Sequence, residues 1–393
     1  MPWAEWADLQ QRAPVAWLPE SPRAYFGPPA AGYWAVTRYA DVVEVSRHPE
    51  RFSSAIGATQ IADPPTEFDL AILQQMMLNM DPPAHGRLRR LVAREFTPRA
   101  ITRLHQSIKD NAREIVDDLI EAGPSDFVAA VAAEMPLRVL ADLLGVPRED
   151  RHLLFDWSNR TIGAEDPEYG GGFDDFQAAF NEMFAYGHAL AEERSKSPRD
   201  DLTSLLLQRG PNGEGLSLVE FDMFWFLLII AGNETTRNQL AGSVLTLDQH
   251  PDQRAWLLDD LAARLPVATE ELLRFWSPVV HFRRTAAHDT ELAGQTITAG
   301  EKVVVFYPAA NRDPSVFADP HRLDLTRNPV NHLAFGSGPH FCLGSHLAKL
   351  EIVEMLHELY SRVPEVAVAG EPERTHSAFI NGLNHLPVSF SRP

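Results

Sequence analysis

A long apolar segment in the middle of the chain restricts the possible fold more than any other feature. Ser217 and Glu220 form a capping-box pattern, and LVEFDMFWFLLIIAGNETTRNQLAGSVLTL follows. A capping box marks the start of a helix. A helix that is apolar on every side must be buried on every side. We therefore expect one continuous helix through the core of a mainly α-helical protein with small β-sheets.

Polar residues interrupt this helix where packing alone would favour leucine. Asn233, Glu234, Thr235 and Thr236 follow Gly232 at its centre. Burying a carboxylate and hydroxyls without hydrogen-bond partners costs several kcal/mol. Their presence therefore indicates a polar function or internal water, and a satisfied structural network is the alternative.

The segment FGSGPHFCLG, residues 335–344, contains Cys342, the only cysteine of the chain. Its glycines allow sharp turns, and apolar residues at helical spacing follow it. A thiol at a helix start loses its proton readily, because the helix N-terminus carries partial positive charge. A lone cysteine is more often a small buried apolar residue. A nucleophile would need a matching His and Asn or Asp, which cannot be singled out among 15 histidines.

The composition excludes some classes of function. With 54 acidic and 35 basic residues the net charge is -19, which argues against nonspecific nucleic-acid binding. A single cysteine permits no internal disulfide and fits a reducing compartment. The first residues, MPWAEWADLQQRAPVAW, lack a signal-peptide pattern, and the longest apolar run, 223–231, is shorter than the roughly 20 residues of a membrane span. We expect a soluble cytoplasmic protein.

The remaining pattern predicts one domain over residues 1–393, β-rich at roughly 30–60, 278–310 and 375–393 and α-helical elsewhere. The opening to about residue 32 is expected to be irregular, with a strand at 33–36 and a helix capped by Thr37 after it. Further helices are expected at about 97–122, 127–144, 148–162 and 173–195. Turns are expected at Ala293-Gly294, Ala299-Gly300 and, in a terminal hairpin, Asn381-Gly382.

Two helical segments carry charged pairs. In DPPAHGRLRR, His85 and Arg89 are four residues apart and share a face, which suits either a solvated basic surface or a bound carboxylate. In EELLR, Glu271 and Arg274 are three apart, a spacing typical of an ion pair worth up to about 0.5 kcal/mol on a surface.

Taken in chain order, these segments resemble the cytochrome P-450 superfamily, and the resemblance covers nearly the whole chain. The cysteine loop matches the family pattern F-G-x-G-x-H/R-x-C-x-G at every fixed position. The resemblance implies heme b with Cys342 as the iron ligand. It also implies a structural pair, Glu271 and Arg274, with Arg322 or Arg327 as third partner. The other cofactor-binding residues that it implies are His85, Arg89, Arg284 and His340 at the propionates, with Phe335, Gly336, Gly344, Ala231 and Gly232 beside the heme.

The resemblance also implies a reaction. AGNETT looks like the family's oxygen-activation segment, in which Glu234 and Thr235 would deliver protons so that one atom of O2 enters a C–H bond. No flavin- or nicotinamide-binding fingerprint is present, so electrons from NAD(P)H should arrive through a separate ferredoxin-type donor. Arg87, Arg90, Arg94 and Lys349 would attract that donor. We expect a monomer.

The substrate is expected to be apolar, because the residues predicted to line its pocket are mostly apolar. AGNETTRN and INGLNHLPV look most like actinobacterial-type members that hydroxylate steroids, branched lipids or terpenoid- and fatty-acid-like chains. Alternatives are a natural-product hydroxylase or epoxidase, a peroxide-driven enzyme of the same family, and a heme-binding sensor or carrier. The predicted pocket comprises the loop at 55–80, Leu227, Ile230, Ala231, Val279, Val280, His281, Phe282, Ile380 and Asn381.

Overall fold

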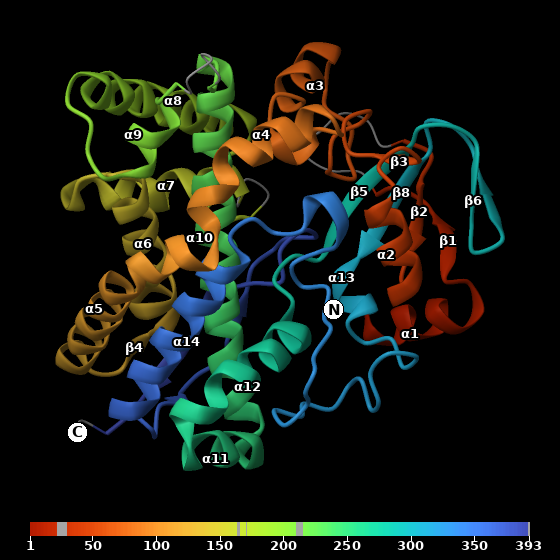
Figure 1. Cartoon of the computed structure of the whole chain (residues 1–393). Coiled ribbons are helices and arrows are strands. Elements are labelled where there is room, and N and C mark those ends of the chain that lie inside the picture. Colours follow the sequence, from red (N-terminus) through yellow and green to blue (C-terminus); the bar gives the residue numbers. More distant parts are fainter. Residues whose placement is uncertain (22–29, 163–165, 170, 210–214, 392–393) are drawn as a thin grey trace. The chain divides into compact units, whose positions relative to one another are not determined.

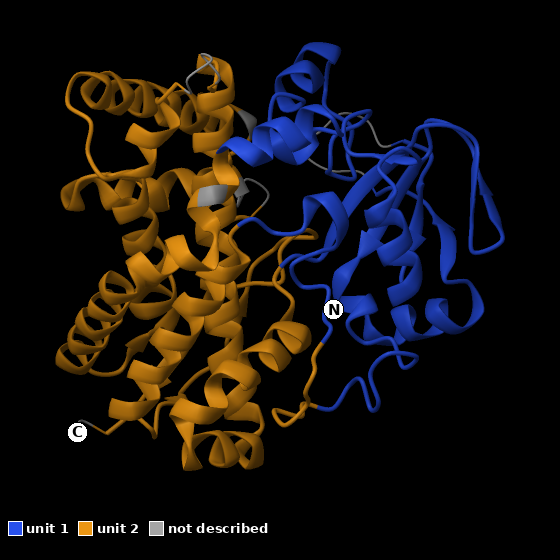
Figure 2. Ribbon diagram, in the orientation of Figure 1, with its two compact units in different colours: residues 1–91, 279–322, 331–343 blue, residues 92–278, 323–330, 344–393 orange. Residues whose placement is uncertain are grey.

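The computed structural model describes residues 1–21, 30–162, 166–169, 171–209 and 215–391, without the side chains of Arg94, Ile162 and Phe173. The chain divides into two compact units (Figure 2). The first contains residues 1–91, 279–322 and 331–343, and the second contains residues 92–278, 323–330 and 344–393. Each unit thus assembles segments that are far apart in sequence.

The first unit is built around a five-stranded sheet with the order β1-β2-β8-β5-β3. β2 and β8 are parallel, and the other neighbouring pairs are antiparallel. The strands of this unit are β1 (Val15–Leu18), β2 (Tyr33–Val36), β3 (Phe52–Ser53), β5 (His281–Ala286), β6 (Thr290–Leu292), β7 (Gln295–Ile297) and β8 (Lys302–Phe306). Its helices are α1 (Trp3–Arg12), α2 (Tyr39–Arg47), α3 (Glu67–Leu73), η1 (Met77–Asn79), α13 (Tyr307–Ala310) and η5 (Gly338–His340). Helix α4 (Ala84–Val92) begins in this unit and ends at the first residue of the second.

Apolar residues cover both faces of this sheet. One cluster contains Val36, Val303 and Val305 with Val42 and Val45 of α2, and the other contains Ala35, Val304 and Phe306 with Trp6 of α1. Alternate residues of a strand point to opposite faces. β8 is therefore apolar throughout its central residues, and its position inside the sheet follows from this.

The second unit is mainly helical, and α10 runs through it (Figure 1). α10 begins at Leu218 behind the predicted capping box of Ser217 and Glu220 and ends at Gln249. It packs against α6, α7, α8, α12 and α14. The helices are η2 (Ala93–Phe96), α5 (Pro98–Ala122), η3 (Val128–Ala132), α6 (Glu134–Leu144), η4 (Arg148–Asp150), α7 (Arg151–Ile162), α8 (Phe173–Lys196), α9 (Leu202–Leu206), α10 (Leu218–Gln249), α11 (Pro251–Asp259), α12 (Leu261–Trp276) and α14 (Ser345–Arg362).

Glycine allows a close helix contact in this unit. A Cβ at Gly242 of α10 would lie 2.1 Å from the indole ring of Trp276 in α12. The short strands are β4 (Ser125–Asp126), β9 (Ala367–Val368), β10 (Glu373–Arg374), β11 (Leu383–His385) and β12 (Pro387–Ser389). The prediction of a mainly α-helical protein with small sheets is confirmed.

Three local predictions were wrong. The opening is not irregular, because α1 and β1 lie within it; residues 22–29 are outside the described residues. Thr37 does not cap α2, whose N-cap is Arg38; the Thr37 hydroxyl instead donates to the carbonyl of Pro14. Asn381-Gly382 is not a two-residue hairpin turn. The strand after it, β11, pairs with β10, which already ends at Arg374, and β12 pairs with β4 and β9.

The turns at Ala293-Gly294 and Gly300 form as predicted, with positive φ at all three residues. Across the described residues, no helix combines the length and hydropathy that a membrane span requires.

Candidate active site

The cysteine loop is closed by its own backbone. The amide of Cys342 donates to the carbonyl of Phe335 at 2.9 Å, and Gly336 and Gly338 have φ of 72° and 70°. A Cβ at Gly338 would lie 2.2 Å from the carbonyl oxygen of Ser46 in α2. The thiol of Cys342 is half-buried and lies three residues before Ser345, where α14 begins.

Four basic side chains of the first unit gather beside this loop. The rings of His85 and His340 lie 4.2 Å apart, and Arg89 donates to the carbonyl of Phe341 at 2.7 Å. Arg284, on β5, is buried and donates to the carbonyl of Arg283 at 2.8 Å. The structure thus brings together all four residues predicted to bind carboxylates.

The positive charge of this group comes from Arg89 and Arg284, because the pKa values of both histidines are lowered. Burial and the charges of Arg284 and His85 lower the pKa of His340 to about 2. Burial, then Arg89 and Arg284, lowers the pKa of His85, and Asp81 opposes them. Burial lowers the pKa of Arg89, and the charge of Cys342 partly offsets it. An anion with two carboxylates would compensate the charges of Arg89 and Arg284 and could accept hydrogen bonds from the two histidines.

In the second unit, the centre of α10 carries a buried carboxylate. Glu234 is 2% exposed, and its Oε2 accepts from Arg237 at 2.7 Å and from Asn238 at 3.3 Å. Its Oε1 has no hydrogen-bond partner among the described residues. Burial raises the pKa of Glu234, and the Arg237 guanidinium opposes this shift. Thr235 is half-buried, and its hydroxyl donates to the carbonyl of Ala231 at 2.8 Å.

Arg237 was missed by the sequence reasoning. Its guanidinium is buried, donates to Asn159 of α7 at 2.8 Å, and lies over the rings of Phe155 and Tyr169. The signal was present, since an arginine three residues after a glutamate in an apolar helix is placed to pair with it.

The predicted pair on α12 is fully buried. Arg274 donates to both carboxylate oxygens of Glu271 at 2.7 Å, and both side chains are 0% exposed. Of the two possible third partners, Arg327 fills the role, with its Nε 3.2 Å from Glu271 Oε2. The backbone amide of Asp324 also donates to Glu271. These contacts of Glu271 with Arg274, Arg327 and Asp324, which we call the Glu271 bracket, join α12 to the segment at 323–330.

The predicted pocket residues belong to both units. Leu227, Ile230 and Ala231 lie on α10, Ala231 exposed and the other two half-buried. Val280 and His281 are buried beside Phe306, and Val279 and Phe282 pack against the core cluster with Tyr307. Ile380 is buried. Asn381 is tied to Trp276: its side chain donates to the Trp276 carbonyl at 2.5 Å, and its own carbonyl accepts from the indole at 3.0 Å.

Comparison with known proteins identifies the family of this chain. The family model described as "Cytochrome P450" matches residues 153–362. The chain is 40% identical to the steroid C26-monooxygenase of Mycobacterium tuberculosis, over 100% of this chain and 90% of that protein. It is 41% identical to the methyl-branched lipid omega-hydroxylase of the same organism, over 98% and 90%. A solved cytochrome P450 of Mycobacterium marinum in complex with pseudoionone superposes with a TM-score of 0.93 at 39% identity, over 98% of this chain and 94% of that one.

The chain therefore belongs to the cytochrome P450 family. It is a monooxygenase, an enzyme that uses heme iron and O2. The residues present fit that cofactor. A loop thiol suits the iron, and two arginines with two histidine hydrogen-bond donors suit the two propionates.

Proposed function

We propose that this protein inserts oxygen into a C–H bond of a steroid or a methyl-branched lipid. Two curated relatives with those substrate classes in their names match along the whole chain. The side chains predicted to line the pocket are mostly apolar, which suits such a substrate.

The observation that carries the proposal is the Cys342 loop with its basic neighbours. Cys342 would ligate the iron, and His85, Arg89, Arg284 and His340 would hold the propionates. When bound, heme supplies the iron at which O2 is bound and reduced. Phe335, Gly336, Gly344, Ala231 and Gly232 would contact the cofactor without donating charge.

Glu234 and Thr235 would deliver the protons that the reduction of O2 requires. The raised pKa of Glu234 lets its carboxyl hold a proton at a pH where an exposed glutamate would not, and Oε1 is the oxygen not held by Arg237 or Asn238. The Thr235 hydroxyl is held by the Ala231 carbonyl, and its oxygen keeps lone pairs to accept a hydrogen bond. Glu234 would hold the proton, and Thr235 would position the group that receives it.

Electrons would come from NAD(P)H through a separate ferredoxin. Arg87 and Arg90 are exposed, and Lys349 lies 2.6 Å from Glu270; the side chain of Arg94 is outside the described residues. Exposed arginines can steer an acidic partner even on a chain of net charge -19. We place the reaction in the cytoplasm, since a single cysteine fits a reducing compartment, and we expect a monomer.

The test is reconstituted turnover. The purified holoprotein is titrated with steroids, methyl-branched fatty acids and polar natural products, and spin-state shifts are recorded. Substrates that bind are then incubated with NAD(P)H, ferredoxin and ferredoxin reductase at low and high salt. We expect hydroxylated steroid or lipid, no product without ferredoxin, and a steep fall in rate with salt.

Three results would contradict this proposal. Turnover confined to polar natural products would contradict the proposed steroid or methyl-branched lipid substrate. Product formed with hydrogen peroxide but not with NAD(P)H, ferredoxin and reductase would contradict the electron route, and a rate independent of salt would contradict the role of the exposed arginines. Tight ligand binding with no turnover under any of these conditions would favour a carrier or sensor.

A further inference from the structure

The loop between β3 and α4 has a fixed base and an exposed tip. The tip, α3, buries none of its residues, and Phe68 is 73% exposed. The base is buried at Ala58, Thr59 and Ile61. It is closed by the Thr59 hydroxyl, which donates to the side chain of Asn79 at 2.8 Å.

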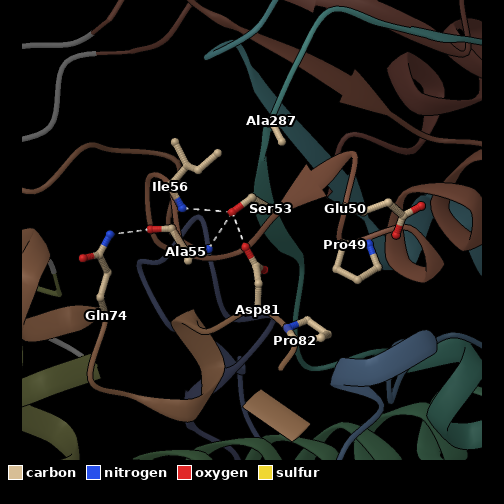
Figure 3. Close-up of a pocket in the computed structure, with 9 residues that line it drawn as sticks. All are labelled: Pro49, Glu50, Ser53, Ala55, Ile56, Gln74, Asp81, Pro82 and Ala287. Carbon is tan, nitrogen blue, oxygen red and sulfur yellow. Dashed lines mark hydrogen bonds between the residues drawn. The ribbon is translucent and has the colours of Figure 1, made fainter. Parts of the chain in front are cut away.

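A network of hydrogen bonds holds the first turn of this loop. Figure 3 shows the Ser53 hydroxyl accepting from the amides of Ala55 and Ile56 and donating to Asp81, while Gln74 donates to the Ala55 carbonyl. A cavity of about 460 Å³ lies against this turn. The turn therefore has open space on one side, and its position depends on polar contacts.

Four charged side chains fix the rest of the base, and we call them the loop latch: Glu20, Asp63, Arg283 and Lys302. Arg283 donates to Asp63 at 2.6 Å, and its backbone amide donates to the Thr59 carbonyl at 2.9 Å. Lys302 donates to the Ile61 carbonyl at 2.8 Å, pairs with Glu20 at 2.7 Å and lies 2.8 Å from Asp63. A Cβ at Gly57 would lie 2.0 Å from the Arg283 guanidinium, so the chain passes directly over it.

The charges of the latch balance only while Asp63 is present. Arg283, Lys302 and Glu20 are almost fully buried, whereas the Asp63 side chain is 48% exposed. Burial would raise the pKa of Asp63, but the hydrogen bond from Lys302 and the charge of Arg283 outweigh it and hold the pKa below its usual value. Neutralising Asp63 would leave two buried cations facing one anion. The loop that carries Asp63 would then be held less firmly.

The strand that carries one arm of the latch also carries a residue of the basic cluster. Arg283 and Arg284 are neighbours on β5, and neighbouring strand residues point to opposite faces. Arg283 therefore holds the loop while Arg284 joins the basic cluster beside Cys342. β5 therefore carries both a residue that holds the loop and a residue of the basic cluster.

We propose that Asp63 is a positioning residue for substrate binding, which holds the base of the 57–63 loop on Arg283 and Lys302. This inference rests on the proposed function, because the pocket predicted for its substrate includes the loop at 55–80. Asp63 acts through the loop and does not itself touch the reacting atoms.

The experiment compares Asp63→Asn, Asp63→Glu and the control Glu291→Gln in the holoprotein. Glu291 is an exposed carboxylate on the β6–β7 hairpin of the same unit. Readouts are amide hydrogen exchange over residues 55–66, the Kd from substrate-induced spin shifts, and KM and kcat. For Asp63→Asn we expect faster exchange at 57–63 and a Kd and KM raised about tenfold. The value of kcat should stay within about twofold, because the chemistry occurs elsewhere. Asp63→Glu should restore binding, and Glu291→Gln should match the wild type.

Unchanged exchange and unchanged KM in Asp63→Asn would overturn the proposal. A loss of kcat and of bound heme in equal measure, with KM unchanged, would also overturn it, since that would show a general structural role. If the wild type shows no spin shift with any steroid or lipid, the proposed function fails; the exchange comparison still decides whether Asp63 fixes the loop.

Discussion

Thr235 and Glu234 are adjacent in sequence but differ in their surroundings. The Thr235 hydroxyl is half-buried and bonded to its own helix, and Glu234 is enclosed with Arg237 and Asn238. Arg237 does not cancel the effect of burial, because the pKa of Glu234 remains raised. Each side chain can therefore be tested separately.

Thr235→Ala should leave heme content and substrate binding unchanged but release hydrogen peroxide in place of product. Product formed per NAD(P)H consumed should fall by about tenfold or more, since a positioned proton-transfer group is worth about 100-fold or more. Thr235→Ser, which keeps the hydroxyl, is the control and should stay close to the wild type. Unchanged coupling in Thr235→Ala would remove Thr235 from the proton route.

The identity of a residue's partner was the part of the site that the sequence could not supply. Glu271 and Arg274 are recognisable from their spacing, but choosing Arg327 over Arg322 needed the fold of the 323–330 segment. The pairing of Arg237 with Glu234 could have been predicted from their spacing, but its bond to Asn159 of α7, 78 residues earlier, could not. Spacing predicts contacts along one helix, whereas contacts between elements depend on packing.

Among the elements, α12 carries a fully buried ion pair whose loss should strongly reduce stability. Glu271 faces two arginines, and neither it nor Arg274 is exposed. Removing one partner of a buried ion pair leaves uncompensated charge, which is more costly than the loss of a surface pair.

Glu271→Gln should therefore destabilise the protein by about 3–5 kcal/mol. The neighbouring Glu270→Gln is the matched control: it removes a surface pair with Lys349 and should cost no more than about 1 kcal/mol. Urea unfolding of the two variants measures the difference. Equal urea midpoints for the two variants would mean that the buried contacts of Glu271 do not stabilise the protein more than the surface pair of Glu270.

Elements with a strong local signal were predicted well. α10 has its capping box and uniform apolarity, and the Ala293-Gly294 turn has residues suited to positive φ. The strand at Tyr33–Val36 was predicted, but its parallel pairing with β8 was not, because the partners are about 270 residues apart. The Asn381-Gly382 turn failed because tertiary bonds to Trp276 determine the conformation there.

At the scale of the whole molecule, the candidate residues are divided between the two units. Cys342 and the basic cluster belong to the first, and Glu234, Thr235 and the Glu271 bracket belong to the second. Family membership rests on matches along nearly the whole chain. The role of Cys342 is the claim on which the other proposed roles depend.

The measurement that tests this claim most directly is the absorption spectrum of the reduced protein with carbon monoxide. We predict a strongly red-shifted Soret band, because a thiolate donates electron density to the iron. The band should be absent in Cys342→Ser and present in Ser337→Ala, a control in the same loop. A band typical of histidine ligation in the wild type, or an unchanged band in Cys342→Ser, would contradict the account.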